Sequence, residues 1–299
     1  IKYPEGSKSW RFQAYRFNLQ SNELSTWARV DQSQILVNLG FFGTLEFEKP
    51  LKKSKTPLYV IPYINGLAYK DFELNQNNKS FAYGGDAKIA IGNGMNLDVT
   101  VNPDFSNVEV DDIIANLTRF EISLPEKRQF FIDNNDLFGG YGSFRDAIPF
   151  FSRRIGIAKD SAGNTIQNKI IGGVRLSGKL DQDWRLGFLS IQNQEDLQNQ
   201  IASNNNTMLT LQRRIFSRSQ IGVFAINRQA FKEYDFLSEE DKFNTVVGFD
   251  SNLVSPDNTW SSNIYMHKSY QPGDNKGNLS SRIRVQYNTR EWRIFSDAV

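Results

Sequence analysis

The chain has 299 residues, with 35 basic and 33 acidic side chains and a formal net charge of +2. A balance this near neutrality argues against nucleic acid as a partner. Mean hydropathy is −0.49, and no apolar run approaches the ~18 residues that a membrane-spanning helix needs. A helical membrane protein is therefore excluded. A β-barrel is not, because every second residue of a barrel strand faces a polar interior.

Few residue types are available for site chemistry. Cysteine is absent, which removes disulfides, thiolate zinc sites and cysteine nucleophiles. Histidine occurs once, at His267, so a Ser-His-Asp triad or a multi-histidine metal site is hard to build. We therefore expect no resident cofactor. Aromatic residues make up 13% of the chain, and aromatic girdles of barrels use such residues.

The first half of the chain predicts strands at irregular spacing. Alternating apolar and polar residues indicate strands at 10–19, 35–47, 58–72, 80–91, 95–102 and 117–124. From Pro125 to Phe151 the alternation is lost. Pro125–Arg128 predicts the start of a short helix, and Gly139–Gly142 predicts its end. A non-strand segment of this length is typical of an inner loop, a plug-like element or a surface loop.

The second half predicts a regular series of strands. Period-two alternation is clearest at 170–180, 244–253 and 279–288. In the last of these, Leu279, Ile283 and Val285 share one face, and Arg282 and Arg284 share the other. Weaker versions of the pattern occupy 184–192, 207–215, 220–228, 260–268 and 292–298.

The connections between these strands alternate in length. Short ones are expected at 179–183, 216–219, 255–258 and 288–291, and long polar ones at 192–206, 230–243 and 270–278. Outer-membrane barrels have short periplasmic turns and long external loops. Trp184, Trp260 and Trp292 each follow a short turn, which predicts part of a periplasmic aromatic girdle. The alternative is a soluble antiparallel sandwich or barrel, which also alternates and also uses tight turns.

Several sequence blocks resemble a known family. The carrying blocks are Leu97–Glu109, Asn116–Glu121, Pro125–Phe131, Asp136–Phe138, Phe151–Gly156, Ile171–Lys179, Ser219–Val223 and Asn227–Arg228. In this order they resemble large outer-membrane proteins of Gram-negative bacteria, in which a family-9-like carbohydrate-binding module precedes a barrel domain of unknown function. The resemblance implies a partial antiparallel transmembrane β-barrel over residues 1–299, with 125–151 as an inner loop or plug-like segment. It also implies a binding module upstream and further strands downstream.

Polar side chains that could line the lumen or fix the inner loop form the candidate site. They are Asp104, Glu109, Glu126, Lys127, Arg128, Arg153, Arg154, Arg175, Arg282 and Arg284. The cluster of Asp104, Glu109, Asp111 and Asp112 could bind calcium, but solvated turns are also acidic. The charge runs at 126–128 and 153–154 predict either an ion-pair network or a solvated loop. The lumen arginines predict either an anion-attracting channel or a structural ladder of ion pairs.

Three functions follow from this interpretation. The first is a non-enzymatic outer-membrane channel or transporter, with glycans as the solute class implied by the resemblance. The second is an accessory barrel subunit of a larger outer-membrane complex for secretion, nutrient uptake or envelope assembly. The third is a surface hydrolase on a barrel scaffold, for which no catalytic residue can be assigned. The expected partners are outer-membrane lipid, a glycan ligand, and other outer-membrane proteins or lipoproteins.

Overall fold

The computed structural model describes residues 6–30, 38–52, 58–71, 76–92, 94–103, 126–143, 146–161, 163, 165–274 and 278–299. The chain is all-β and divides into two compact units, residues 1–56 and 57–299. Among the described residues, no helix has the length and apolar character needed to cross a membrane.

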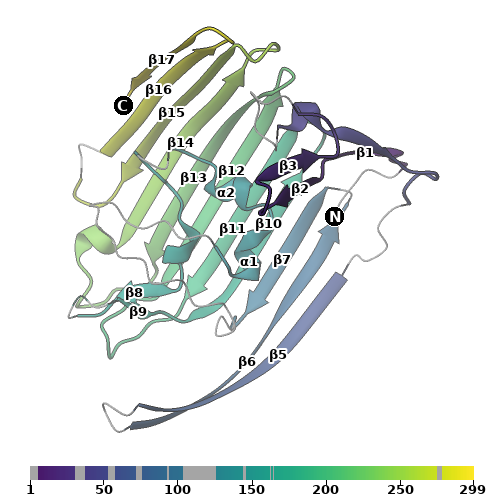
Figure 1. Cartoon of the computed structure of the whole chain (residues 1–299). Coiled ribbons are helices and arrows are strands. Elements are labelled where there is room, and N and C mark those ends of the chain that lie inside the picture. The colour runs from purple at the N-terminus through teal and green to yellow at the C-terminus, as the bar shows by residue number, and fades with distance from the viewer. Residues whose placement is uncertain are drawn as a thin grey trace. The chain divides into compact units, whose positions relative to one another are not determined.

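The first unit contains two short antiparallel strand pairs. β1 (Ser9–Phe12) pairs with β4 (Gly43–Glu46), and β2 (Tyr15–Asn18) pairs with β3 (Glu23–Thr26). A single 3₁₀ turn, η1 (Leu39–Phe41), precedes β4. These are the darkest ribbons in Figure 1.

Two sequence predictions in this unit are wrong in extent. The strand expected at 10–19 is divided at Gln13, whose side-chain amide bonds both the backbone N–H and the carbonyl of Ala28 at 2.9 Å. These bonds take the place of a strand ladder, so the chain changes partner there. The strand expected at 35–47 begins only at Gly43 among the described residues. Asn38 accepts a hydrogen bond from the Gly40 N–H and so caps η1.

In the second unit, the described strands form an antiparallel sheet of eleven strands in the order β17-β16-β15-β14-β13-β12-β11-β10-β7-β6-β5. The strands are β5 (Leu58–Asp71), β6 (Gln76–Ile91), β7 (Met95–Val101), β10 (Ile170–Lys179), β11 (Trp184–Asn193), β12 (Asn204–Ile215), β13 (Ser219–Ala230), β14 (Phe243–Val254), β15 (Trp260–Tyr270), β16 (Asn278–Asn288) and β17 (Arg293–Ala298). Within the described part of the chain, no ladder joins β5 to β17, so the sheet is open.

The strands β5–β7 and β10–β17 confirm the predicted ones to within a few residues. Cross-strand pairing is unbroken over most of each ladder, as in Leu176↔Phe188 and Leu209↔Ala225. The predicted strand at 117–124 lies outside the described residues. Alternation was a good guide here because successive side chains of a strand point to opposite faces.

The sheet has two faces with different surroundings. The inner face carries Arg175, Leu189, Met208, Phe224 and Tyr265, all of which are buried. The outer face carries the alternate residues of the same strands, including Leu176, Phe188, Leu209, Val223 and Met266.

The connections at the two ends of the strands differ in length, and each row of strand ends is called an edge below. The turns after β6, β10, β12, β14 and β16 are short and meet at one edge, which we call the short-turn edge. The connections after β7, β11, β13 and β15 lie at the opposite edge and are longer. The predicted alternation of connection length along β10–β17 is therefore confirmed. Gly94 and Gly178 allow a close backbone approach at the short-turn edge, since a Cβ on Gly178 would lie 2.1 Å from the Gly94 carbonyl oxygen.

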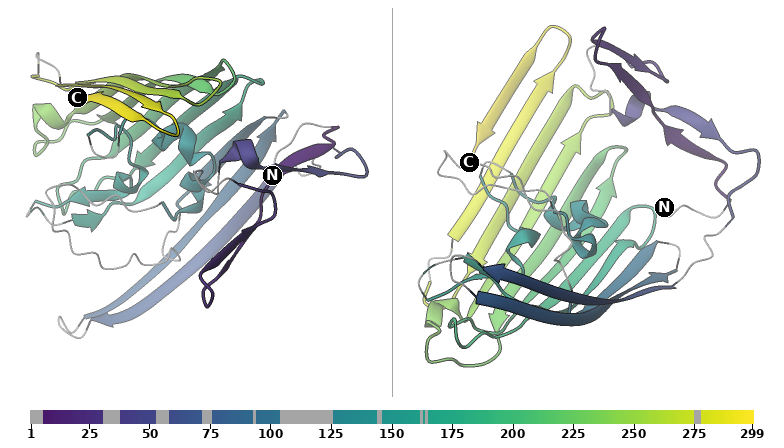
Figure 2. Two further views of the ribbon diagram at one scale, coloured as in Figure 1. Left: turned by 45° about the horizontal axis from the view of Figure 1, so that its top comes forward. Right: turned by 60° about the horizontal axis from the view of Figure 1, so that its bottom comes forward.

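A largely non-strand segment covers the inner face. It contains α1 (Gln129–Ile132), α2 (Asn135–Gly139) and η2 (Ser152–Arg154), and the hairpin of β8 (Ile157–Lys159) and β9 (Thr165–Gln167) follows it. We call residues 126–143 and 146–156 the inner segment. Figures 1 and 2 show its helices on the concave side of the curled sheet.

The hydrophobic core lies between the inner segment and the sheet. The segment contributes Phe131, Leu137, Phe138, Tyr141 and Ile155, and the sheet contributes Leu189, Ile191, Met208 and Phe224. Leu137 and Met208 are fully buried. The inner face is thus closed to solvent here by the chain itself.

Candidate functional site

The inner segment and the inner face of the sheet form the candidate site, because they hold most of the buried charges. Arg128 joins the two ends of the segment. Its guanidinium forms two hydrogen bonds to Glu126, of 2.9 and 2.8 Å, and donates to the carbonyls of Ile155 and Ser152, each at 2.6 Å. The Ser152 hydroxyl also donates to Glu126 at 2.6 Å. Arg128 additionally lies over the ring of Phe131.

This arrangement holds Glu126 in its charged form. Burial raises the pKa of the Glu126 carboxyl, but the hydrogen bonds from Arg128 and Ser152 and the charge of Arg128 outweigh it, so that the pKa is lowered overall. Each of the three nitrogens of the Arg128 guanidinium donates to at least one acceptor, which helps a buried ion pair to be tolerated.

A second ionic group lies on β6, β7 and β10. Arg175, only 1% exposed, donates to Asp98 at 3.0 Å, and Lys88 lies 3.5 Å from the other oxygen of Asp98. Lys88 also pairs with Asp133 of the inner segment. The Arg175 guanidinium lies 5.4 Å from the ring centre of Phe130. The sheet and the segment are thus linked by charge as well as by packing.

A third ionic contact attaches α2 to β11. Arg185 forms a two-pronged ion pair with Asp136, at 2.6 and 3.1 Å. The hydrogen bond from Arg185 is the main reason that the pKa of Asp136 is lowered. Burial opposes this effect but does not outweigh it.

A fourth group attaches the middle of the segment to β14, β15 and β16. The Gly142 N–H donates to Asp250 at 2.7 Å, and the other oxygen of Asp250 lies 2.6 Å from His267 Nε2. Tyr265 stacks on His267, with ring centres 4.6 Å apart. Arg282 donates to Ser143 at 2.5 Å and to Asp146 at 2.6 Å, and it also pairs with Asp297.

Glycines on the inner face make room for aromatic rings of the segment. A Cβ on Gly187 would lie 3.0 Å from two ring atoms of Phe138, and one on Gly222 would lie 3.0 Å from the ring of Tyr141. The Tyr141 hydroxyl also contacts the Thr210 hydroxyl, and burial raises the pKa of Tyr141. Sequence analysis did not single out these glycines. The signal that could have identified them is a glycine at an inner-face position of an otherwise regular strand, because such a glycine marks the close approach of another group.

The other predicted polar residues have weaker roles. Arg284 is half-buried on β16, with its Nε 4.0 Å from Asp297. Lys127 and Arg153 are half-buried in the segment and Arg154 is exposed. Asp104 and Glu109, with the rest of the proposed acidic calcium cluster, lie outside the described residues. Among the residues that are described, no group of three acidic or histidine side chains is placed to hold a metal ion.

The three predicted girdle tryptophans lie at the short-turn edge. Trp184 is paired in register with Arg213, whose guanidinium lies 5.1 Å from the Trp184 ring centre. Trp260 is paired with Tyr287, with ring centres 4.8 Å apart. Trp292 directly precedes β17 and is exposed. Trp184 and Trp260 both extend the outer face.

The single histidine of the chain lies in a buried pair on the inner face. Asp250 and His267 form a buried pair, but within the described residues His267 Nδ1 has no hydrogen-bond partner, so no hydroxyl is placed against it as a nucleophile. What the inner face does supply is a series of charged and aromatic contacts that hold one segment against a curved sheet.

Comparison with known proteins gives one match. A profile described as "Domain of unknown function (DUF5916)" matches residues 54–215. The chain belongs to this family. The matched range covers β5 to β12 and the whole inner segment, so the segment is part of what defines the DUF5916 domain. No curated protein and no solved structure matches the chain.

Proposed function

We propose that this chain supplies strands to a transmembrane β-barrel of the bacterial outer membrane whose interior is occupied by the inner segment. The observation that carries the proposal is the polarity of the two faces. The inner face buries Arg175, Asp250 and His267, whereas the outer face exposes hydrophobic side chains. Soluble proteins rarely expose a contiguous apolar face of this kind, whereas barrels in lipid do.

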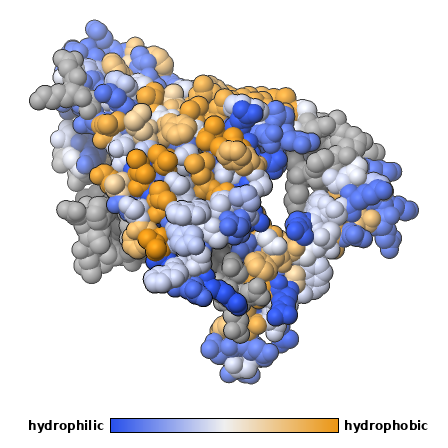
Figure 3. Space-filling view, turned by 90° about the horizontal axis from the view of Figure 1, so that it is seen from above, coloured by the Kyte–Doolittle hydropathy of each residue, from blue (hydrophilic) through white to orange (hydrophobic). Residues whose placement is uncertain are grey.

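The outer face offers the lipid contact that such a protein needs. Leu209 and Val223 are each 49% exposed, Ile283 is 55% exposed and Met266 is 57% exposed. Figure 3 shows hydrophobic side chains gathered in a broad patch on the surface. Contiguous apolar surface of this kind marks a membrane or protein contact. Trp260 and Phe216 at the short-turn edge are exposed as well, as expected of side chains at a membrane interface.

The inner segment favours an occluded barrel over an open pore. It buries Leu137 and Phe138 against β11 and β12. Ion pairs or hydrogen bonds link it to β6, β10, β11, β12, β14 and β16. A transporter of this construction passes solute only when the segment moves. The glycan preference rests on the family resemblance alone and is tested with oligosaccharides as solutes.

The tight attachment of the segment also favours a second candidate, an accessory barrel in a larger outer-membrane complex. In that case the long connections would bind the partner. The connections after β11 and β13 are hydrogen-bonded to each other, because Glu195 accepts from Lys232 at 3.0 Å and from Tyr234 at 2.7 Å.

The deciding experiment uses the complete natural protein. Membranes are fractionated, and the detergent extract is run on a gel with and without boiling. Outer-membrane enrichment with a boiling-dependent shift in mobility is expected. A soluble protein with no shift would overturn the membrane proposal. Planar-bilayer recording then separates the two candidates, because a transporter gives gated conductance and a permanently closed accessory barrel gives none.

A further inference from the structure

A basic pocket lies at the short-turn edge, apart from the contacts that hold the inner segment. Its volume is about 220 Å³. The residues that line it come from the ends of β10 to β13 and the turns between them, and they are Lys179, Gln182, Asp183, Arg185, Gln212, Arg213, Arg214, Arg218, Ser219 and Gln220. Five of these side chains are cationic and one is acidic.

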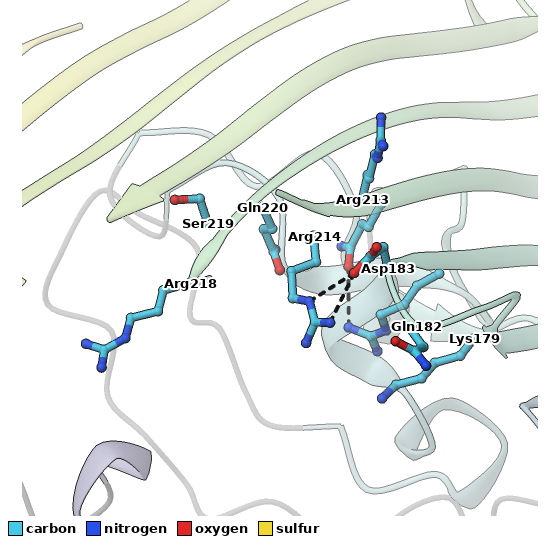
Figure 4. A pocket seen from close by; sticks show the side chains of 10 residues that line it. Lys179, Gln182, Asp183, Arg213, Arg214, Arg218, Ser219 and Gln220 are labelled. Carbon is cyan, nitrogen blue, oxygen red and sulfur yellow. Dashed lines mark hydrogen bonds and ion pairs between the residues drawn. The ribbon is translucent and has the colours of Figure 1, made fainter. Parts of the chain in front are cut away.

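The strand register explains why these charges meet. Arg185 is paired with Gln212, and Arg214 is paired with Gln220, so these four side chains share the inner face of three neighbouring strands. The turns after β10 and β12 then bring Gln182, Asp183 and Arg218 to the same edge. Figure 4 shows the Arg214 guanidinium against Asp183, with Gln182 and Lys179 beside them.

Internal carboxylates neutralise only part of this charge. Arg214 donates twice to Asp183, at 3.2 and 3.0 Å, and Arg185 is paired with Asp136. Lys179 and Arg218 have no carboxylate partner among the described residues. Arg213 points to the outer face, where it lies against the Trp184 ring, so its charge is not directed into the pocket. The pocket therefore keeps an excess of positive charge. The N–H donors of Lys179 and Arg218 are exposed and hydrated, and are available to a ligand.

We propose that this pocket binds a phosphate group. A phosphate offers several acceptor oxygens and a charge that lysine and arginine donors match together, whereas one carboxylate could satisfy only one guanidinium fork. The side chains of Gln182 and Gln212 add neutral donors. Exposed Lys179 and Arg218 supply the first attraction, and Arg214 supplies the nearest guanidinium.

The phosphate could belong to a lipid headgroup or to a soluble compound. Under the proposed membrane position, Trp184 on the outer face places the short turns at headgroup depth, because indole rings favour that depth. The pocket opens on the inner face, so a headgroup would reach it around these turns. The pocket itself requires no membrane, so inorganic phosphate tests it independently of the proposed function.

The test measures binding of inorganic phosphate to the complete detergent-solubilised protein by titration calorimetry, at constant ionic strength set with chloride. The pocket variant is Lys179→Gln with Arg218→Gln. The matched control is Arg290→Gln with Arg293→Gln, which removes the same charge from exposed positions on the same edge. We expect the pocket variant to weaken phosphate binding at least about tenfold, equivalent to ~1.4 kcal/mol. The control should change it little.

The second arm identifies the source. The protein is reconstituted in vesicles of phosphatidylglycerol and phosphatidylethanolamine, and the phospholipid retained after extraction is measured by native mass spectrometry. Loss of retained phospholipid in the pocket variant supports a headgroup. Unchanged phospholipid with weakened phosphate binding supports a soluble phosphate compound. Phosphate binding that is absent, unchanged in the pocket variant, or weakened equally by the control overturns the proposal.

Discussion

The two faces of the main sheet differ in what they bury and what they expose, although the same strands form both. On the inner face, Arg175 and His267 are buried and reach carboxylates on neighbouring strands. On the outer face, Leu209 and Met266 are 49% and 57% exposed. The difference shows that side chains of the sheet are buried where the inner segment covers them, whether they are charged or apolar. The segment, more than the sheet, decides which residues form the core.

The largest effect is expected from breaking the Arg128 cluster. Arg128→Ala leaves Glu126 buried without its ion-pair partner, and we expect a loss of about 3–5 kcal/mol in the free energy of unfolding. Chemical denaturation in detergent micelles measures it. Arg290→Ala, at an exposed turn position, is the control. Equal effects of the two changes would show that the inner segment does not depend on this cluster.

The hydrophobic anchor of the segment comes next. Leu137 is fully buried, so Leu137→Ala should cost about 2–5 kcal/mol through lost burial and the cavity left behind. Ile132→Ala in the neighbouring helix removes an exposed side chain and should cost much less. If the barrel proposal is right, Leu137→Ala also increases single-channel openings in planar bilayers. A stable variant with unaltered conductance would favour the accessory-barrel candidate.

Introducing a charged side chain on the outer face tests whether this face contacts lipid. Leu209→Arg should destabilise the protein in bilayers by ~2–4 kcal/mol if this face meets lipid, because the guanidinium loses its hydration. On a water-exposed sheet the same change falls within about ±0.5 kcal/mol. Gln198→Arg, at an exposed position in the connection after β11, is the control. Reversible folding into vesicles gives both values, and a neutral Leu209→Arg contradicts the lipid contact.

Adding a side chain at a close-packed glycine of the inner face should lower the free energy of unfolding by a smaller amount. Gly187→Val introduces atoms where Phe138 and Thr210 already lie, and overpacking of this kind costs about 1–3 kcal/mol. Gly66→Val on β5 is a matched control, because a Cβ there meets nothing within 4 Å. Trypsin sensitivity of the inner segment should rise in the first variant alone.

The smallest expected effect is on the pH dependence of stability. The folded-state pKa values of Glu126 and Asp136 are both lowered from ordinary values of 4.5 and 3.8. Their contribution is therefore complete above those ordinary values and is lost as the pH falls through the lowered folded-state values. Denaturation midpoints between pH 6 and pH 3 measure this. Glu126→Gln should flatten the acid limb, and an unchanged limb would assign the acid sensitivity to other carboxylates.

Much of the sheet was predictable from local pattern. Alternation placed β10 to β17 because each strand has one packed face, and turn residues placed the short connections. The inner segment was predictable only as a stretch without alternation. Its contacts join Arg128 to Ile155, Arg185 to Asp136 and Gly142 to Asp250, and no local pattern specifies pairs so far apart in the chain.

The sequence alone therefore determined the all-β class, the strands of the second half and the face on which each residue lies, because strand periodicity is a local property of the backbone. Only the tertiary structure decided that the inner face is covered and that Gly187 and Gly222 admit aromatic rings. It also decided that basic residues of β10 to β12 and of the turn after β12 converge on one pocket. Those outcomes depend on strand register and on the path of the inner segment. Both are set by contacts between residues distant in the chain.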